Sequence, residues 1–195
     1  MQVDLTRETI DLGPLALEIL RPPSADALID EARFADDEFM PYWAELWPSG
    51  LELARAVASR DLNGVRVLEL GCGLGLPSLA AAARGARVFA TDWAADALAL
   101  LGENAARNAL AVETALVRWT EPESLRAGAP WDLVLGADLL YEPRNIDVLL
   151  DLLPRLGERV LLAEPGRPTA ERFFAGATAT WEISQQGRVY ELVAR

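Results

Sequence analysis

Short apolar runs alternate with segments of helical periodicity between residues 65 and 175. The apolar runs predict strands at 65–70, 87–92, 113–119, 133–137 and 159–163. Segments with apolar residues three or four positions apart predict helices at 76–84, 95–108, 143–153 and 169–175. Apolar strands that alternate with helices are typical of a parallel sheet buried on both faces. We therefore expect an α/β fold in which helices flank the sheet.

The two ends of the chain follow other patterns. Residues 3–20 alternate in part and predict a short hairpin, and a short helix at 25–34 is expected to begin at Ser24. An aromatic-rich segment at 40–50 then leads into a helix that ends near residue 60. The runs 180–185 and 188–194 predict an antiparallel C-terminal hairpin. We expect one domain over residues 1–195, with an N-terminal cap at 1–60 and a Rossmann-like core at 61–195.

Composition narrows the chemistry. The 195 residues are 51% hydrophobic, and no apolar run approaches the ~18 residues of a membrane-spanning helix. All 18 basic residues are arginine, histidine is absent and Cys72 is the single cysteine, which argues against histidine-based nucleophilic catalysis and against a transition-metal site. The formal net charge of −12 argues against a nucleic-acid partner. We expect a soluble cytoplasmic protein with neither nucleic acid nor a membrane as its partner.

A glycine-rich loop follows the first predicted strand of the core. Gly71, Gly73 and Gly75 stand at alternate positions before a predicted helix, which is typical of a nucleotide-binding corner. The dinucleotide pattern G-x-G-x-x-G has its third glycine one residue later, so this spacing disfavours an NAD enzyme. With Glu69 two residues before the first glycine, the run has the form E-x-G-x-G-x-G. That form resembles motif I of the seven-strand S-adenosylmethionine-dependent methyltransferases.

Further candidates lie at the ends of the predicted strands, where ligands bind in open parallel sheets. Asp92 ends the second strand, 21 residues after Gly71, and is placed to accept hydrogen bonds from ribose hydroxyls. Trp93 follows it directly. Trp119, at the end of the third strand, either flanks an adenine ring or plugs the sheet edge. Cys72 lies inside the glycine loop, where a small residue fits a tight turn.

The fourth predicted strand ends at Ala137 and continues as Asp138-Leu-Leu-Tyr141. A carboxylate here could hold a substrate amine through a charge-assisted hydrogen bond. Tyr141 could wall the channel for methyl transfer or contact an ammonium group through its ring. The pair is also compatible with a helix N-cap followed by a packing tyrosine. An acidic protein suits a sulfonium or an amine better than an anion.

Several motifs in this order give the chain a specific resemblance. They are Trp47-Pro48-Ser49-Gly50, Glu69-Leu-Gly-Cys-Gly-Leu-Gly75, Thr91-Asp92, Trp119 and Asp138-Leu-Leu-Tyr141. Over about residues 40 to 167 the chain resembles the lysine methyltransferases of the methyltransferase-16 family, some of them described as nicotinamide N-methyltransferase-like. Pro41-Tyr-Trp43 and Pro165-Gly-Arg167 most resemble the branch that methylates the β subunit of electron transfer flavoprotein.

The resemblance implies a fold, a methyl donor and residue roles. The implied fold is a Rossmann-like seven-strand methyltransferase sheet, and the implied donor is S-adenosyl-L-methionine, which becomes S-adenosyl-L-homocysteine. Asp138 and Tyr141 are implied to be catalytic and to serve a substrate lysine. The resemblance places Trp47, Gly71, Gly73, Asp92, Trp119 and Ala137 against the cofactor. Glu69, Cys72 and Trp93 join this cofactor-binding set through their places in the glycine motif and at the second strand end.

Three functions stay open at this point, because a fold does not determine a substrate. They are a protein-lysine N-methyltransferase that acts on a protein presenting lysine, a methyltransferase for small-molecule amines or N-heterocycles, and a non-catalytic cofactor-binding protein. No histidine is available as a base, so we expect Asp138 to orient the amine while its proton leaves to water. The substrate, the number of methyl groups, the oligomeric state and the role of Arg167 are left open.

Overall fold

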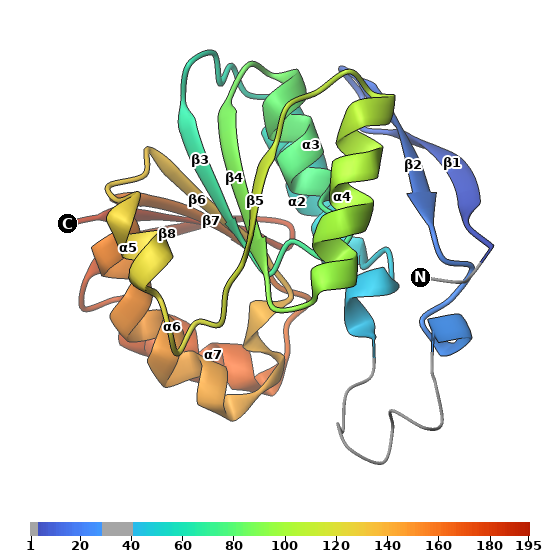
Figure 1. The fold of residues 1–195 in the computed structure, drawn as a ribbon. Coiled ribbons are helices and arrows are strands. Elements are labelled where there is room, and N and C mark those ends of the chain that lie inside the picture. Colours follow the sequence, from blue (N-terminus) through green and yellow to red (C-terminus); the bar gives the residue numbers. More distant parts are fainter. Residues whose placement is uncertain (1–3, 29–40) are drawn as a thin grey trace.

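The computed structural model describes residues 4–28 and 41–195. Its centre is a seven-stranded sheet with helices on both faces (Figure 1). The strands of this sheet are β3 (Arg66–Leu70), β4 (Arg87–Asp92), β5 (Glu113–Leu116), β6 (Leu133–Ala137), β7 (Arg159–Ala163), β8 (Trp181–Gln186) and β9 (Val189–Ala194). The α-helices are α2 (Pro48–Ala58), α3 (Leu76–Ala83), α4 (Ala95–Arg107), α5 (Glu123–Ala127), α6 (Pro143–Leu156) and α7 (Pro168–Ala177).

The strand order across the sheet is β5-β4-β3-β6-β7-β9-β8. Strands β3 to β7 are parallel, and β9 pairs antiparallel with both β7 and β8. The predicted α/β class and the antiparallel C-terminal hairpin are therefore confirmed. The direction in which successive strands are added reverses between β3 and β6. Strands β4 and β5 are added on one side of β3, and the chain then crosses to the other side, where β6 and β7 are added. Ligands bind beyond the carboxyl ends of the strands at such a switch point.

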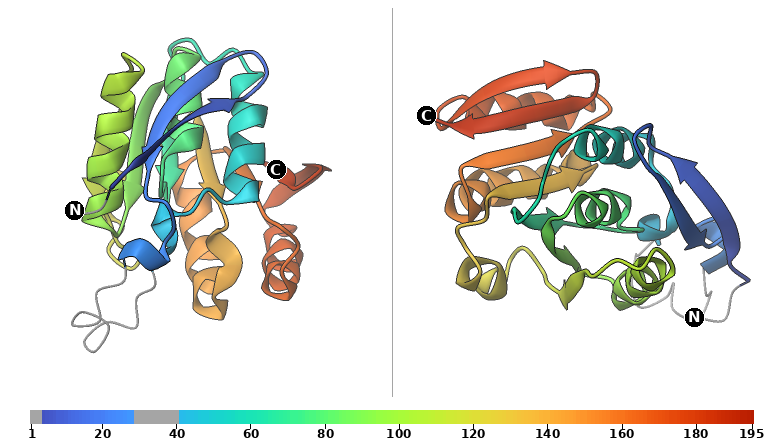
Figure 2. Two further views of the ribbon diagram at one scale, coloured as in Figure 1. Left: turned by 90° about the vertical axis from the view of Figure 1, so that its right-hand side faces the viewer. Right: turned by 90° about the horizontal axis from the view of Figure 1, so that it is seen from above.

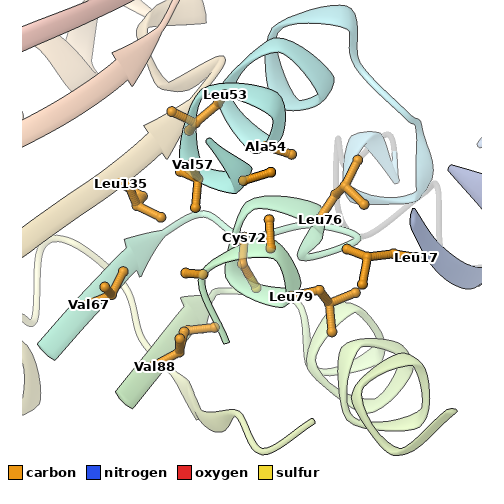
Figure 3. Close-up of a cluster of buried hydrophobic side chains, with 14 of the residues drawn as sticks. Leu17, Leu53, Ala54, Val57, Val67, Cys72, Leu76, Leu79, Val88 and Leu135 are labelled. Carbon is orange, nitrogen blue, oxygen red and sulfur yellow. The ribbon is translucent and has the colours of Figure 1, made fainter. Parts of the chain in front are cut away.

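Each central strand sends alternate side chains into two separate apolar cores. In β3, Val67 belongs to the core under α2, α3 and α4, whereas Leu68 and Leu70 belong to the core under α5, α6 and α7. Figure 3 shows the first core, in which Cys72 of the glycine loop lies among aliphatic side chains of the strands and of α2 and α3. Because both faces are buried, these strands are mostly apolar in the sequence.

A two-stranded sheet lies beside the helices α2, α3 and α4, which cover the first core (Figure 2). Its strands β1 (Thr6–Asp11) and β2 (Ala16–Arg21) form the antiparallel hairpin predicted for this part of the chain. Asn104 of α4 is fully buried and attaches the hairpin, because its Oδ1 accepts the N–H of Leu20 at 2.7 Å while its Nδ2 donates to the Leu20 carbonyl at 3.0 Å. The hairpin thereby closes the outer edge of the first core.

The structure departs from the predicted elements in a few places. The strand predicted at 113–119 ends at Leu116, because β4, with which it pairs, ends opposite that residue. The short helix α5 was not predicted. In the segment predicted to be helical from 25 to 34, the described part is a 3-10 turn, and residues 29–34 lie outside the described residues. None of the helices described is long and apolar enough to cross a membrane.

Candidate functional site

A cavity of about 360 Å³ lies at the carboxyl ends of β3, β4 and β6. This volume is within the ~300–1,000 Å³ that is typical of small-molecule sites. The cavity brings together all of the residues predicted for the site, which are Trp47, Glu69, Gly71, Cys72, Gly73, Asp92, Trp93, Trp119, Ala137, Asp138 and Tyr141. Most of them meet because β3, β4 and β6 are neighbouring parallel strands whose carboxyl ends share one edge of the sheet, whereas Trp47 comes from the start of α2 and Trp119 from the segment after β5.

The glycine loop lines the cavity in a left-handed conformation. Gly71, Gly73 and Gly75 have φ angles of 60°, 52° and 72°, which residues with a side chain rarely adopt. A Cβ at Gly73 would lie 3.1 Å from the carbonyl oxygen of Trp43, so the segment before α2 lies close against the loop. A Cβ at Gly75 would lie 2.3 Å from Cδ1 of Leu101, a buried side chain of α4. Gly75, which departs from the dinucleotide spacing, therefore allows the loop to pack on α4.

Asp92 connects the end of β4 to the glycine loop. Its Oδ2 accepts the N–H of Gly73 at 2.9 Å, and its Oδ1 accepts the N–H of Ala94 at 2.9 Å. Burial raises the pKa of the Asp92 carboxyl, and these backbone hydrogen bonds oppose that rise. Each carboxylate oxygen has two acceptor positions. Asp92 can therefore accept further hydrogen bonds from a diol in the cavity while it holds the loop.

Two other ionisable groups are buried beside the loop. Burial raises the pKa of Glu69 to about 8, although a hydrogen bond from the Ser78 hydroxyl acts in the opposite direction. Glu69 ends up mostly protonated at neutral pH, and its hydrogen bond links β3 to α3. Burial also raises the pKa of the Cys72 thiol well above its ordinary value, and the nearby carboxyls of Asp92 and Glu69 add to this rise. Cys72 is thus a packing residue and not an activated nucleophile.

Aromatic side chains surround the cavity. Four of them are more than a third exposed, and these form the aromatic rim: Tyr42, Trp47, Trp93 and Tyr141. Trp47 Nε1 donates to the carbonyl oxygen of Tyr42 at 2.9 Å, which fixes these two residues relative to each other. Trp119 is partly buried against the second core, and a Cβ at Gly71 would lie 3.4 Å from its ring. Large exposed rings gathered around one cavity are typical of a surface that contacts a ligand or partner.

Asp138 leaves β6 with a left-handed backbone, at φ 57° and ψ 29°. Strained conformations of this kind cluster at functional sites. Its Oδ1 lies 2.7 Å from Nη1 of Arg167, whereas its Oδ2 is buried and has no hydrogen-bond partner among the described residues. A buried acceptor without a donor is costly. A ligand that donates a hydrogen bond to Oδ2 would therefore be stabilised.

Tyr141 lies three residues after Asp138, at the end of a 3-10 turn (Leu139–Tyr141). Partial burial raises the pKa of the Tyr141 hydroxyl, and the negative charge of Glu142 adds to the rise. The hydroxyl therefore stays protonated in the neutral range, where it can donate a hydrogen bond. Its ring belongs to the aromatic rim and is open to an approaching substrate.

Some lining residues were missed by sequence reasoning. Tyr42, Trp43, Glu45 and Leu46 come from the segment before α2, where only the density of aromatic residues is unusual. Arg167, whose role the sequence leaves open, also lines the cavity. No periodic pattern connects these segments to the strand ends, because their approach depends on how the chain returns over the sheet.

The strand order of the seven-stranded sheet and the glycine loop at its switch point are those of the Rossmann-like methyltransferase fold. Solved structures share this fold. The T. Thermophilus 16S rRNA N2 G1207 methyltransferase (RsmC), in complex with AdoMet and guanosine, has a TM-score of 0.66 at 17% identity over 98% of this chain and 50% of that chain. The magnesium protoporphyrin IX methyltransferase (ChlM) from Synechocystis PCC 6803, with bound SAM, has a TM-score of 0.59 at 16% identity over 88% of this chain and 98% of that chain.

The chain belongs to the lysine methyltransferase family, whose family model matches residues 36–178. This is the methyltransferase-16 family that the motifs of the sequence resemble. It is 37% identical to the electron transfer flavoprotein beta subunit lysine methyltransferase of Xenopus laevis, over 65% of this chain and 53% of the relative. It is 34% identical to the histone-arginine methyltransferase METTL23 of Xenopus laevis, over 78% of this chain and 68% of the relative. The chain spans about half the length of several curated relatives that it matches.

Proposed function

We propose that this chain is an S-adenosylmethionine-dependent methyltransferase that acts on the lysine amine of a protein. One observation carries the proposal: the buried Oδ2 of Asp138 has no donor among the residues that the structure describes, and it lies in the same cavity as the glycine loop and Asp92. An acceptor for an amine and a cradle for a nucleoside thus share one space. This combination is what direct transfer between two bound groups requires.

The described residues fit S-adenosylmethionine as the methyl donor. Gly71 and Gly73 line the cavity with backbone that carries no side chain, and Asp92 has spare acceptor positions for ribose hydroxyls. Trp93 and Trp119 offer ring faces for an adenine. When bound, the donor supplies a methyl group on a sulfonium that is already activated. Trp47, Glu69, Cys72 and Ala137 also line the cavity, and they complete the proposed set of residues that bind the donor.

Transfer requires an amine that has lost its proton. The amine lone pair forms the new N–C bond, while the electron pair of the broken C–S bond stays on sulfur. A lysine amine has an ordinary pKa of ~10.4, so its proton must first leave, in this proposal to water. Asp138 accepts a hydrogen bond from the amine and fixes the direction of the nitrogen. Tyr141, at the rim, contacts the lysine side chain as it enters.

The aromatic rim supports a protein as the substrate. Its exposed rings lie where a protein surface that presents a lysine would dock. By their names, the relatives act on the β subunit of electron transfer flavoprotein and on histone, which are also proteins. We further propose that residues 1–195 work as one domain. The proposed compartment is the cytoplasm, which agrees with a single, free and buried cysteine.

The test uses isotopically labelled S-adenosylmethionine and a fractionated cell lysate as the acceptor mixture. The expected result is label on lysine in one or a few proteins. Asp138→Asn is expected to lower transfer by about 100-fold, since a misplaced nucleophile costs on that order, while calorimetric binding of S-adenosylmethionine is kept. Asp147→Asn is the matched control, because Asp147 makes an exposed ion pair with Arg172 and does not line the cavity.

Three results would change the proposal. Near-normal transfer by Asp138→Asn would remove Asp138 from the catalytic role. Label found only in small molecules would favour a small-molecule N-methyltransferase. Retained donor binding without transfer to any fraction would favour a non-catalytic binding protein.

A further inference from the structure

Arg167 joins two carboxylates at the ends of neighbouring strands. Its Nη1 lies 2.7 Å from Oδ1 of Asp138 and 3.3 Å from both carboxylate oxygens of Glu164. The strand register explains this meeting, because Ala137 of β6 pairs with Ala163 of β7 and each carboxylate is the next residue in its chain. The two acidic side chains therefore leave the sheet side by side, with one guanidinium between them.

Glu164 and Arg167 differ in their relation to the cavity. Glu164 is 2% exposed and does not line the cavity, and one of its oxygens also accepts the backbone N–H of Arg167 at 3.0 Å. Arg167 lines the cavity together with Asp138. Glu164 thus lies behind the guanidinium and holds it, and the guanidinium is the group nearer to a substrate.

The charge around the cavity is otherwise acidic. The remaining ionisable side chains of the lining are Tyr42, Glu45, Glu69, Cys72, Asp92 and Tyr141. Among the lining residues that the structure describes, only Arg167 carries a positive charge. An amine that meets uncompensated carboxylates is held as an ammonium ion, which has no lone pair for transfer. A cation close to the amine has the opposite effect, because like charges disfavour the protonated form.

We propose that Arg167 is a positioning residue that neutralises one oxygen of Asp138, so that a substrate amine docks at the other oxygen and gives up its proton to water. The proposal rests on the proposed methyltransferase function and adds a residue to it. Glu164 acts only through Arg167, by holding the guanidinium against Asp138. Without Arg167, the amine binds Asp138 more tightly but stays protonated to higher pH.

The test is the pH profile of label transfer from S-adenosylmethionine to lysate protein. For Arg167→Gln, the pH of half-maximal rate is expected to rise by ~1–3 units, the usual effect of one neighbouring charge. The rate at pH 7 then falls about tenfold for each unit and recovers as the pH is raised. The concentration of lysate protein that gives half-maximal rate is expected to be lower for Arg167→Gln than for wild type, because the amine binds Asp138 more tightly. Calorimetric binding of S-adenosylmethionine is expected to stay unchanged.

Two further variants separate positioning from folding. Arg167→Gln leaves Glu164 as an unpaired buried charge, so the double variant Glu164→Gln with Arg167→Gln keeps neutral partners in its place. The pH midpoint of the double variant should lie between those of wild type and Arg167→Gln, because the lost positive charge of Arg167 is nearer to the cavity than the lost negative charge of Glu164. Arg172→Gln is the matched control, since it removes a guanidinium from an exposed ion pair with Asp147, and its profile should equal that of wild type.

An unchanged pH midpoint in both Arg167 variants, at whatever rate, would overturn the proposal and leave Arg167 a structural clamp. If the wild type transfers label to protein while the Arg167 variants keep its pH midpoint, the proposed function stays intact. If the label enters small molecules and the pH midpoint still shifts in the Arg167 variants, the role of Arg167 is supported, but the substrate is a small molecule and not a protein. Absence of transfer by the wild type at every pH would overturn both proposals.

Discussion

The buried carboxyl of Glu69 is expected to make the stability of this chain depend on pH in the neutral range. Its pKa is raised by burial from an ordinary value of 4.5 to about 8 in the folded chain. Between these two values the folded chain keeps a proton that the unfolded chain has lost. The free energy of unfolding therefore falls as the pH rises through this window. Glu69→Gln keeps the size and removes the titration.

The magnitude follows from one proton. Each pH unit within the window removes about 1.4 kcal/mol, and the whole window about 5 kcal/mol, which is a large part of the ~5–15 kcal/mol of a typical domain. The midpoint of thermal unfolding should fall by roughly 3–6 °C per pH unit for a chain of this size. Glu18 and Glu191 have lowered pKa values, so their contributions change below about pH 4.5 and lie outside the window. The raised pKa of Asp92 acts in the same direction as that of Glu69.

The assay is urea unfolding between pH 5.5 and 7.5, followed by fluorescence of the six tryptophans. Wild type and the control Glu182→Gln, an exposed position on β8, are expected to lose stability steeply with pH. Glu69→Gln is expected to show a much shallower slope, which comes from Asp92. Equal slopes in all three chains would refute the reasoning, because the proton would then belong to another group.

Three further predictions follow from the glycine loop and its neighbours. Gly75→Ala should cost about 1–3 kcal/mol more unfolding free energy than Gly64→Ala, because both have positive φ but only Gly75 faces Leu101, while Gly64 has open space; equal losses in urea unfolding would contradict this. Asp92→Asn should weaken calorimetric binding of S-adenosylmethionine by about tenfold or more, the worth of a hydrogen bond to a charged group, and an unchanged affinity would remove Asp92 from the donor site. Cys72 should react with iodoacetamide slowly in the folded chain and quickly in urea, because its thiol is buried and its pKa is raised; fast reaction in the folded chain would contradict the packing role.

The central strands could be predicted because burial on both faces leaves a simple signature. Strands β6 and β7 have the predicted bounds, 133–137 and 159–163, since nearly all of their apolar side chains face one core or the other. The edge strand β5 was less predictable. Most of its side chains are exposed, and its end depends on where β4 stops and not on its own sequence.

The candidate site divides in the same way. The glycine loop and Asp92 have a recognisable spacing, because the strand–loop–helix corner is local in the chain. The carbonyl oxygen of Trp43 beside Gly73 has no such signal, since these residues are brought together by the path of the segment before α2. The pairing of Arg167 with Asp138 likewise depends on strand order.

The sequence by itself determined the α/β class, the family resemblance and the residues at the strand ends, because these depend on periodicity and on short motifs. Tertiary structure decided which oxygen of Asp138 pairs with Arg167 and which has no donor in the described part of the chain, and it raised the pKa of Glu69. Burial and the register of distant strands cause these effects. They arise between residues that are far apart in the chain, so only the folded arrangement determines them.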